Sequence, residues 1–110
     1  MYTSQAWRNK PILGTVKFRG IECNVVQDNY VIDFSPCIVL TNKETHEKIV
    51  TVTVYIKSLY LEYPYDHVAI KNSFETEGLL DLLIEANIIS EPVDEFHIGS
   101  VTIYVCKLHK

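Results

Sequence analysis

Residues 72–87 read NSFETEGLLDLLIEAN, and they carry the only helical pattern in the chain. The apolar positions recur at helical spacing: Leu79, Leu82, Leu83 and Ala86, with Leu80 and Ile84 widening the stripe. Asn72 or Ser73 can cap such a helix, and Asn72-x-x-Glu75 has the spacing of a capping box. We therefore predict one amphipathic helix from about Phe74 to Asn87, where an asparagine suits the helix end.

The segments before this helix alternate in the way that is typical of β-strands. Ile12–Phe18 and Ile21–Val25 alternate apolar with polar residues, and Arg19-Gly20 between them predicts a tight hairpin turn. A second turn signal lies at residues 27–29. The β-rich run Tyr30–Phe34 that follows is predicted as a further strand, because valine, isoleucine and aromatic residues favour extended backbone.

The clearest hairpin comes next. Residues 37–40 form an apolar run, 41–48 a charged connector, and 49–56 read IVTVTVYI, with valines on one face and threonines on the other. A short strand at residues 67–71 and a last strand at residues 100–108 complete the pattern. The expected fold is α+β, a mostly antiparallel twisted sheet of five to seven strands with one amphipathic helix packed on one face.

Length and composition restrict the kind of protein. A chain of 110 residues with 47% hydrophobic and 22% charged residues fits a single globular domain, 1–110, and excludes wholesale disorder. Residues 1–10 lack a hydrophobic period, so we expect a flexible arm there without a signal peptide. No apolar run approaches the roughly 18 residues that cross a bilayer, so we expect no membrane partner. Three cysteines without a CxxC pair favour buried thiols and a cytoplasmic location.

Charge is unevenly distributed along the chain. The net charge of −4 argues against direct binding to nucleic acid, yet residues 1–19 hold four basic and no acidic residues, and residues 72–100 hold seven acidic residues and no lysine or arginine. On the predicted helix, Glu77, Asp81 and Glu85 are spaced i, i+4, i+8 and form one acidic stripe away from the leucines. The stripe is either an ordinary solvated helix face or a surface offered to a basic partner.

Tyrosines are concentrated just before the helix. Tyr55, Tyr60, Tyr63 and Tyr65 fall within eleven residues, and Pro64 excludes a central strand among them. Such a cluster either covers a small core or provides contact area at a protein interface, because tyrosine offers a large surface for little lost rotamer entropy.

No pattern of residues predicts a catalytic or metal site. The four histidines lack zinc-ligand spacing, and the chain has no nucleotide-binding or nucleophile-elbow motif. His67 follows Asp66 directly, and His97 follows Asp94 and Glu95, which is the arrangement that can orient an imidazole for proton transfer. We expect no catalytic residue, no metal and no cofactor, and keep a small hydrolase or transferase using His67 or His97 as an alternative.

Four segments carry a resemblance to a known family: GTVKFRGIEC at 14–23, TVTV at 51–54, IKNSFETEGLLDLLIEANII at 70–89 and GSVTIYVCKL at 99–108. Together they resemble an uncharacterised small-protein family, a domain of unknown function, of bacteriophages and conjugative elements of Gram-positive bacteria. The resemblance implies a mobile-element accessory protein. Small acidic phage proteins often inhibit host defence systems, so by analogy it also suggests an inhibitor of the anti-CRISPR type.

The leading hypothesis is a non-enzymatic protein-binding protein in the bacterial cytoplasm. It would bind a basic groove of a host defence nuclease, such as a CRISPR effector, or of another nucleic-acid-binding complex, through an acidic face of the helix and the following loop. The charged contacts would be Glu77, Asp81, Glu85, Asp94 and Glu95, with Tyr60, Tyr63 and Tyr65 as anchors. The main alternative is a homo-oligomeric scaffold, in the simplest case a homodimer, in which the basic start of one copy meets the acidic face of another.

Overall fold

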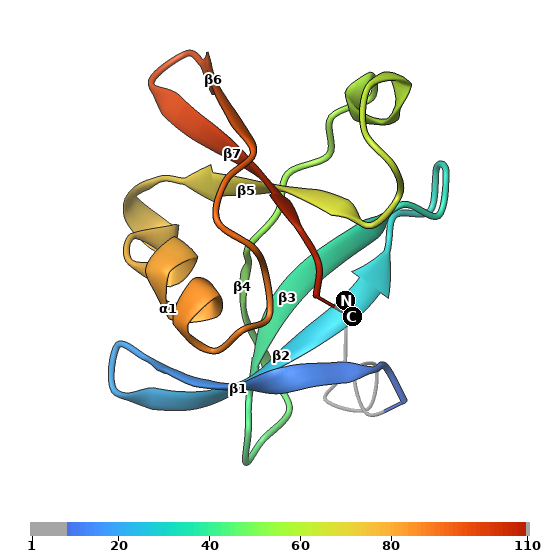
Figure 1. Ribbon diagram of the computed structural model, residues 1–110. Coiled ribbons are helices and arrows are strands. Elements are labelled where there is room, and N and C mark those ends of the chain that lie inside the picture. The colour runs from blue at the N-terminus through green and yellow to red at the C-terminus, as the bar shows by residue number, and fades with distance from the viewer. Residues whose placement is uncertain (1–8, 110) are drawn as a thin grey trace.

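The computed structural model describes residues 9–109, which form seven strands, one α-helix and two 3₁₀ turns (Figure 1). The predicted N-terminal hairpin is confirmed: β1 (Ile12–Phe18) pairs antiparallel with β2 (Ile21–Asn29). Arg19 and Gly20 join them with φ of 52° and 81°, as expected for a two-residue turn whose twist matches the strands. The turn predicted at residues 27–29 is wrong, because these residues continue β2 and pair with β3.

Two more strands complete the first sheet, in the order β1-β2-β3-β4. β3 (Pro36–Asn42) is buried along almost its whole length and pairs with β2 and with β4 (Lys48–Thr51). The charged connector between them turns around Asn42, whose side-chain oxygen accepts hydrogen bonds from the backbone N–H groups of Glu44 and Thr45. The predicted strand at 37–40 and the connector are confirmed with slightly shifted ends, but the strand predicted at 49–56 is confirmed only as far as Thr51.

The strand predicted at Tyr30–Phe34 is instead a loop between β2 and β3. Asp33 Oδ1 accepts hydrogen bonds from the backbone N and the Oγ of Ser35, at 3.0 and 2.7 Å, and Phe34 adopts a left-handed φ of 60°. These contacts bend the chain, so its valine, isoleucine and phenylalanine do not extend into a ladder. The β-propensity of the run loses to the Asp33–Ser35 turn and to Pro36 beyond it.

The segment IVTVTVYI links the two sheets rather than forming one long strand. β4 ends at Thr51, after which Val52 N donates to Ile38 O in the first sheet and Val54 N donates to Ala69 O in the second, at 2.9 and 3.0 Å. The valines that were predicted to share one face therefore pack in two different clusters. Val52 packs in the large core, and Val54 packs against a smaller cluster.

The second sheet has the order β5-β7-β6, all antiparallel. β5 (His67–Asn72) and β7 (Val101–Lys107) match predicted strands. β6 (Asp94–Ile98) was predicted as a loop, but it forms the outer half of a hairpin that turns at Gly99 with a φ of 60°. Its pattern is hard to recognise because four of its five residues are exposed.

The predicted helix is real but much shorter. Ser73 caps a 3₁₀ turn, η3 (Phe74–Thr76), in a capping box with Thr76, so the box predicted from Asn72 to Glu75 is wrong by one residue. Gly78, with a left-handed φ of 88°, separates this 3₁₀ turn from the α-helix, and α1 spans only Leu79–Glu85. Asn87 has a φ of 62°, which agrees with its predicted role at the helix end.

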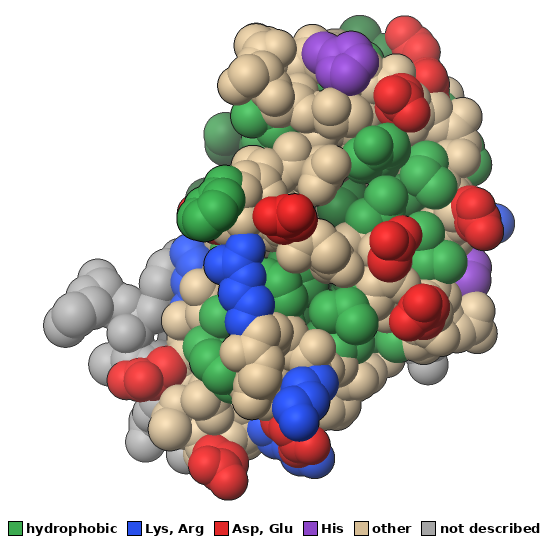
Figure 2. Space-filling view, turned by 90° about the vertical axis from the view of Figure 1, so that its left-hand side faces the viewer, with side chains coloured by type: hydrophobic (Ala, Val, Ile, Leu, Met, Phe, Trp, Pro, Cys, Tyr) green, Lys and Arg blue, Asp and Glu red, His purple; other side chains and the backbone are tan. Residues whose placement is uncertain are grey.

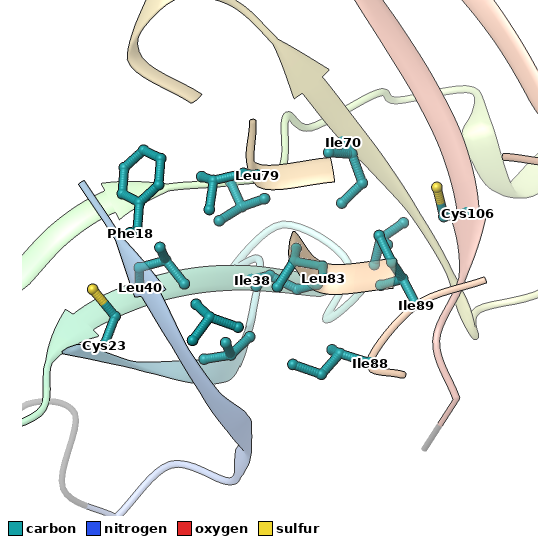
Figure 3. Close-up of a cluster of buried hydrophobic side chains, with 14 of the residues drawn as sticks. Phe18, Cys23, Ile38, Leu40, Ile70, Leu79, Leu83, Ile88, Ile89 and Cys106 are labelled. Atoms are coloured by element: carbon teal, nitrogen blue, oxygen red, sulfur yellow. The ribbon is translucent and has the colours of Figure 1, made fainter. Parts of the chain in front are cut away.

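The main core lies between the first sheet, α1 and one face of the second sheet (Figure 3). Ile38 and Leu40 enter it from β3, Leu79 and Leu83 from α1, and Ile70 from β5. The predicted α+β class with antiparallel strands is confirmed, and the seven strands divide into sheets of four and three. No helix formed by residues 9–109 is long and apolar enough to cross a membrane.

A smaller cluster covers the opposite face of the second sheet. Leu59 and Tyr60 of η2 (Leu59–Leu61) pack there on Ala69, Ile103 and Val105. Figure 1 shows α1 and the segment that carries η2 on opposite sides of β5 and β7. The second sheet therefore separates two surfaces, one beside α1 and one beside the tyrosines.

Candidate protein-binding surfaces

All three carboxylates of the acidic stripe are exposed, but the predicted row along one helix is wrong at Glu77. Glu77 has a ψ of 129° and precedes Gly78, so only Asp81 and Glu85 lie on α1. Leu79 and Leu83 of α1 are buried, which turns Asp81 and Glu85 outward, and Glu77 is exposed just before the helix. None of these three carboxylates takes part in an ion pair among residues 9–109. Figure 2, which views the side on which α1 lies, shows acidic side chains spread across this face with apolar surface between them. The face therefore offers carboxylates that are free to meet an external cation.

An aromatic residue that the sequence analysis did not select lies at the start of this helical segment. Phe74 is 86% exposed, and Arg19 Nη2 donates to its backbone oxygen at 2.6 Å. The Arg19 guanidinium lies 4.8 Å from the ring centre of Phe18 and 5.7 Å from that of Phe74. Helical spacing could not have identified Phe74, because Glu77, with a ψ of 129°, and left-handed Gly78 separate its 3₁₀ turn from α1.

Three basic residues make contacts within the chain. Lys71 Nζ lies 2.8 Å from Glu75 Oε1, and this hydrogen bond lowers the pKa of Glu75. Lys10, from the predicted arm, lies 3.0 Å from Asp28 Oδ1. With Arg19 bound to Phe74, two of the four basic residues expected to dock on a second copy are held within their own chain. Arg8 and the rest of the arm up to residue 8 lie outside the described residues.

The tyrosines do not join the acidic stripe. Tyr60 donates its hydroxyl to His67 O, and its ring lies 4.6 Å from that of Tyr65. Tyr63 donates to Asp94 Oδ2 and lies beside the ring of His67. Tyr60 and Tyr63 pack on the small cluster, on the face of the second sheet that is turned away from α1. The single surface expected from the sequence is therefore two surfaces.

Strand β6 also separates the two acidic residues that were expected to act together. Asp94 pairs with Val105, whose side chain is in the small cluster, so Asp94 lies on the tyrosine side. Glu95 pairs with Tyr104, which packs against the main core, so Glu95 lies on the α1 side. The prediction of one acidic loop fails because alternate residues of a strand point to opposite faces.

The loop between β2 and β3 forms a third exposed surface, which is apolar. Val31, Ile32 and Phe34 are 89%, 77% and 78% exposed, whereas Asp33 is turned inward to Ser35 and to the Tyr55 hydroxyl at 3.3 Å. Tyr30 N donates to Ser35 O at 2.8 Å and so closes the loop. Hydrogen bonds from Ser35 lower the pKa of Asp33. The loop thus holds its polar residue inside and presents its apolar residues.

The residues considered for catalysis lie in ordinary structural settings. His67 Nδ1 lies 2.8 Å from Asp66 Oδ1, and His97 Nδ1 lies 3.1 Å from Thr102 Oγ1. All three cysteines are free and buried, as predicted, and burial raises the pKa of Cys37 to about 11 and of Cys106 to about 12. A thiol with such a pKa is a poor nucleophile near neutral pH. Residues 9–109 contain no group of three His, Cys, Asp or Glu placed to hold a metal ion.

Comparison of the chain with protein-family models, with curated proteins and with solved structures found no match.

Proposed function

We propose that this protein acts by binding another protein, without catalysis, and that its partner offers a basic groove. The observation that carries the proposal is the row of three exposed carboxylates at Glu77, Asp81 and Glu85, which lack an ion pair among residues 9–109. Within α1, Asp81 and Glu85 are like charges at i, i+4 spacing, which destabilises the helix slightly, and an external cationic surface offsets that repulsion. In such a groove the carboxylates take the place of nucleic-acid phosphates.

Phe74 takes the anchoring role that the sequence analysis gave to the tyrosines. Its exposed ring lies at the start of the helical segment, and its backbone is held by Arg19, so binding orders little additional chain. Exposed aromatic residues at the centre of an interface commonly contribute most of the binding energy, and charges around them contribute rate and selectivity. Glu95, on the same side of the second sheet, adds to the acidic surface.

The resemblance to proteins of phages and conjugative elements points to the class of partner. In that setting a basic groove belongs to a host nuclease or DNA-binding complex, and blocking it inhibits defence. A CRISPR effector is the example that we propose, and the cytoplasm of the bacterial host is then the place of action.

The test reverses the three carboxylates. The Glu77→Lys, Asp81→Lys, Glu85→Lys variant and the wild type are used to capture proteins from a bacterial lysate, and mass spectrometry compares them. We expect the wild type to capture a nucleic-acid-binding protein that duplex DNA displaces and that the variant captures at least tenfold less.

The matched control carries the same change of charge on another surface, with Glu22→Lys, Glu44→Lys and Glu47→Lys at the turns of the first sheet. It should capture as well as the wild type. Equal capture by the α1 variant would rule the proposal out.

A further inference from the structure

A pocket of about 280 Å³ opens on the tyrosine side of the second sheet, away from α1. Its apolar wall is formed by Ile56, Leu59, Tyr63 and Phe96. Its polar wall contains Ser58 and two carboxylates, Glu62 and Asp94, and no lysine or arginine among residues 9–109 lines it. The pocket therefore combines an aromatic and aliphatic floor with a double negative charge.

Asp94 is held in a defined position at this pocket. Its Oδ2 accepts a hydrogen bond from the Tyr63 hydroxyl and its Oδ1 accepts one from Glu95 N at 2.8 Å. The Tyr63 hydrogen bond stabilises the ionised form of Asp94 and so lowers its pKa. A carboxylate accepts about four hydrogen bonds, so both oxygens of Asp94 retain capacity for a donor from outside.

Glu62 is the second charge, and it is free. Its side chain is exposed and has no ion pair or side-chain hydrogen bond among residues 9–109. It follows η2 directly, so its backbone is held, and Glu62 N donates to Leu59 O at 3.2 Å. Two carboxylates that share one pocket without a cation repel each other, and a cationic ligand removes that repulsion.

We propose that this pocket receives an arginine side chain of the partner protein. The three methylene groups lie against the wall that includes Tyr63 and Phe96, and the guanidinium lies between Asp94 and Glu62. Arginine fits better than lysine because its planar fork donates to two carboxylates at once and stacks on aromatic rings. The inference rests on the proposed function only in taking the partner to be basic. It does not depend on the α1 face, because the pocket and that face lie on opposite sides of the second sheet.

Strand addition to β6 is the competing way to use this edge. Among residues 9–109, β6 pairs only with β7, so its other edge is open. However, the N–H of Glu95 is already bound by the Asp94 side chain, and Pro92 just before the strand lacks an N–H. An incoming strand that paired with the Glu95 N–H would have to displace the Asp94 carboxylate oxygen from it. Recognition through a side chain in the pocket requires no such change.

The test uses N-acetyl-arginine methylamide as the probe in a titration followed by two-dimensional ¹H–¹⁵N NMR. We expect saturable shifts at the amides of Tyr63, Asp94, Glu95 and Phe96. The citrulline analogue, which has nearly the same shape without the charge, should bind about tenfold more weakly, because it loses the charge-assisted hydrogen bonds. The lysine analogue should fall between them.

Two variants and a control locate the binding. Glu62→Gln changes an exposed side chain that has no side-chain partner, so it leaves the fold intact. Glu62→Gln and Asp94→Asn, each as a single variant, should weaken binding of the arginine probe about tenfold. Asp81→Asn removes the same charge from α1 and should leave the affinity unchanged. Three results would each overturn the proposal. The first is an affinity for the arginine probe in the Glu62 and Asp94 variants equal to that of the wild type, and the second is binding of the citrulline analogue as tight as that of arginine. The third is a shift of these amides on dilution of the protein alone, because it would mark a second copy as the occupant.

This result is separable from the test of the proposed function. The α1 reversal variant should bind the arginine probe normally even where it loses its partner. If the reversal abolishes partner capture but the probe does not bind, only the pocket is wrong. If the probe binds but the reversal leaves capture unchanged, only the α1 face is wrong.

Discussion

The acidic face of α1 and the loop between β2 and β3 are both exposed, but they are built in opposite ways. On α1 the apolar side chains Leu79 and Leu83 are buried and the carboxylates face outward, as the helical pattern predicts. In the loop, Asp33 faces inward and Val31 and Phe34 face outward. In the helix, exposure follows from burial of the leucines, whereas in the loop it follows from hydrogen bonds that close a turn. The same degree of exposure therefore has different consequences for stability.

The buried side of α1 should give the largest effect. Leu83 is fully buried in the main core, so Leu83→Ala should lower the free energy of unfolding by about 3 kcal/mol through lost packing and a residual cavity. Urea unfolding measures this difference. Glu85→Ala, on the exposed side, is the control and should change the stability by no more than about 0.5 kcal/mol. A comparable loss in both variants would show that α1 does not have one buried side.

The polar residue inside the loop should come second. Because hydrogen bonds lower the pKa of Asp33 in the folded protein, its contribution to stability is present above its unfolded pKa near 3.8 and is lost as the pH falls through the lower folded value. Asp33→Asn should therefore be less stable than the wild type at neutral pH, and the difference should shrink below pH 3.8. Urea unfolding of both proteins across this range measures it. A difference independent of pH would contradict the role of the charge.

Backbone strain at Phe34 should have a smaller effect, of opposite sign. Phe34 has a φ of 60°, which costs a residue with a Cβ more than it costs glycine. Phe34→Gly should raise the free energy of unfolding by about 0.5 kcal/mol, after the greater flexibility of glycine in the unfolded chain is deducted. Thermal unfolding detects the gain. Phe34→Ala keeps the Cβ and should show no gain in stability. An equal gain in Phe34→Gly and Phe34→Ala would mean that removal of the ring, and not relief of backbone strain, causes it.

The exposed apolar side chains should contribute least to folding. Replacing Val31, Ile32 and Phe34 together by serine should change the free energy of unfolding by no more than about 0.5 kcal/mol, because these side chains bury little surface. Solubility should increase, since an apolar patch is removed. Val25→Ser is the matched control in the core and should destabilise strongly. A strong loss of stability in the triple variant would mean that these side chains are packed against the protein rather than exposed to solvent.

Local patterns predicted the elements well where a single rule applies. The Arg19-Gly20 turn, the alternating strands around it and the last strand all follow from side-chain period and turn chemistry. Boundaries failed where two rules compete. Gly78 moved the start of the helix from the predicted Phe74 to Leu79, because its left-handed backbone separates the 3₁₀ turn at Phe74–Thr76 from α1. In the same way, the Asp33–Ser35 turn outweighed the β-propensity of Tyr30–Phe34.

The candidate site was only partly predictable, for a different reason. The exposure of Asp81 and Glu85 follows from their spacing against the leucines of α1, and the structure agrees, whereas Glu77 is exposed in the segment before the helix. The separation of the tyrosines from this stripe depends on which face of the second sheet each segment covers. No spacing in the chain contains that information, because residues far apart in sequence decide it. Phe74, selected only from the structure, illustrates the same limit.

Residue order alone accounts for the α+β class, the buried cysteines and the acidic outer side of the helix, because each depends on neighbours within a few positions. Only the tertiary structure decided that the strands divide into two sheets and that Thr51–Val54 crosses between them. It also decided that Asp94 and Glu95 lie on opposite faces, and that Glu62 and Asp94 share one pocket. These features depend on long-range pairing, where backbone hydrogen bonds and the burial of two separate apolar clusters must be satisfied together.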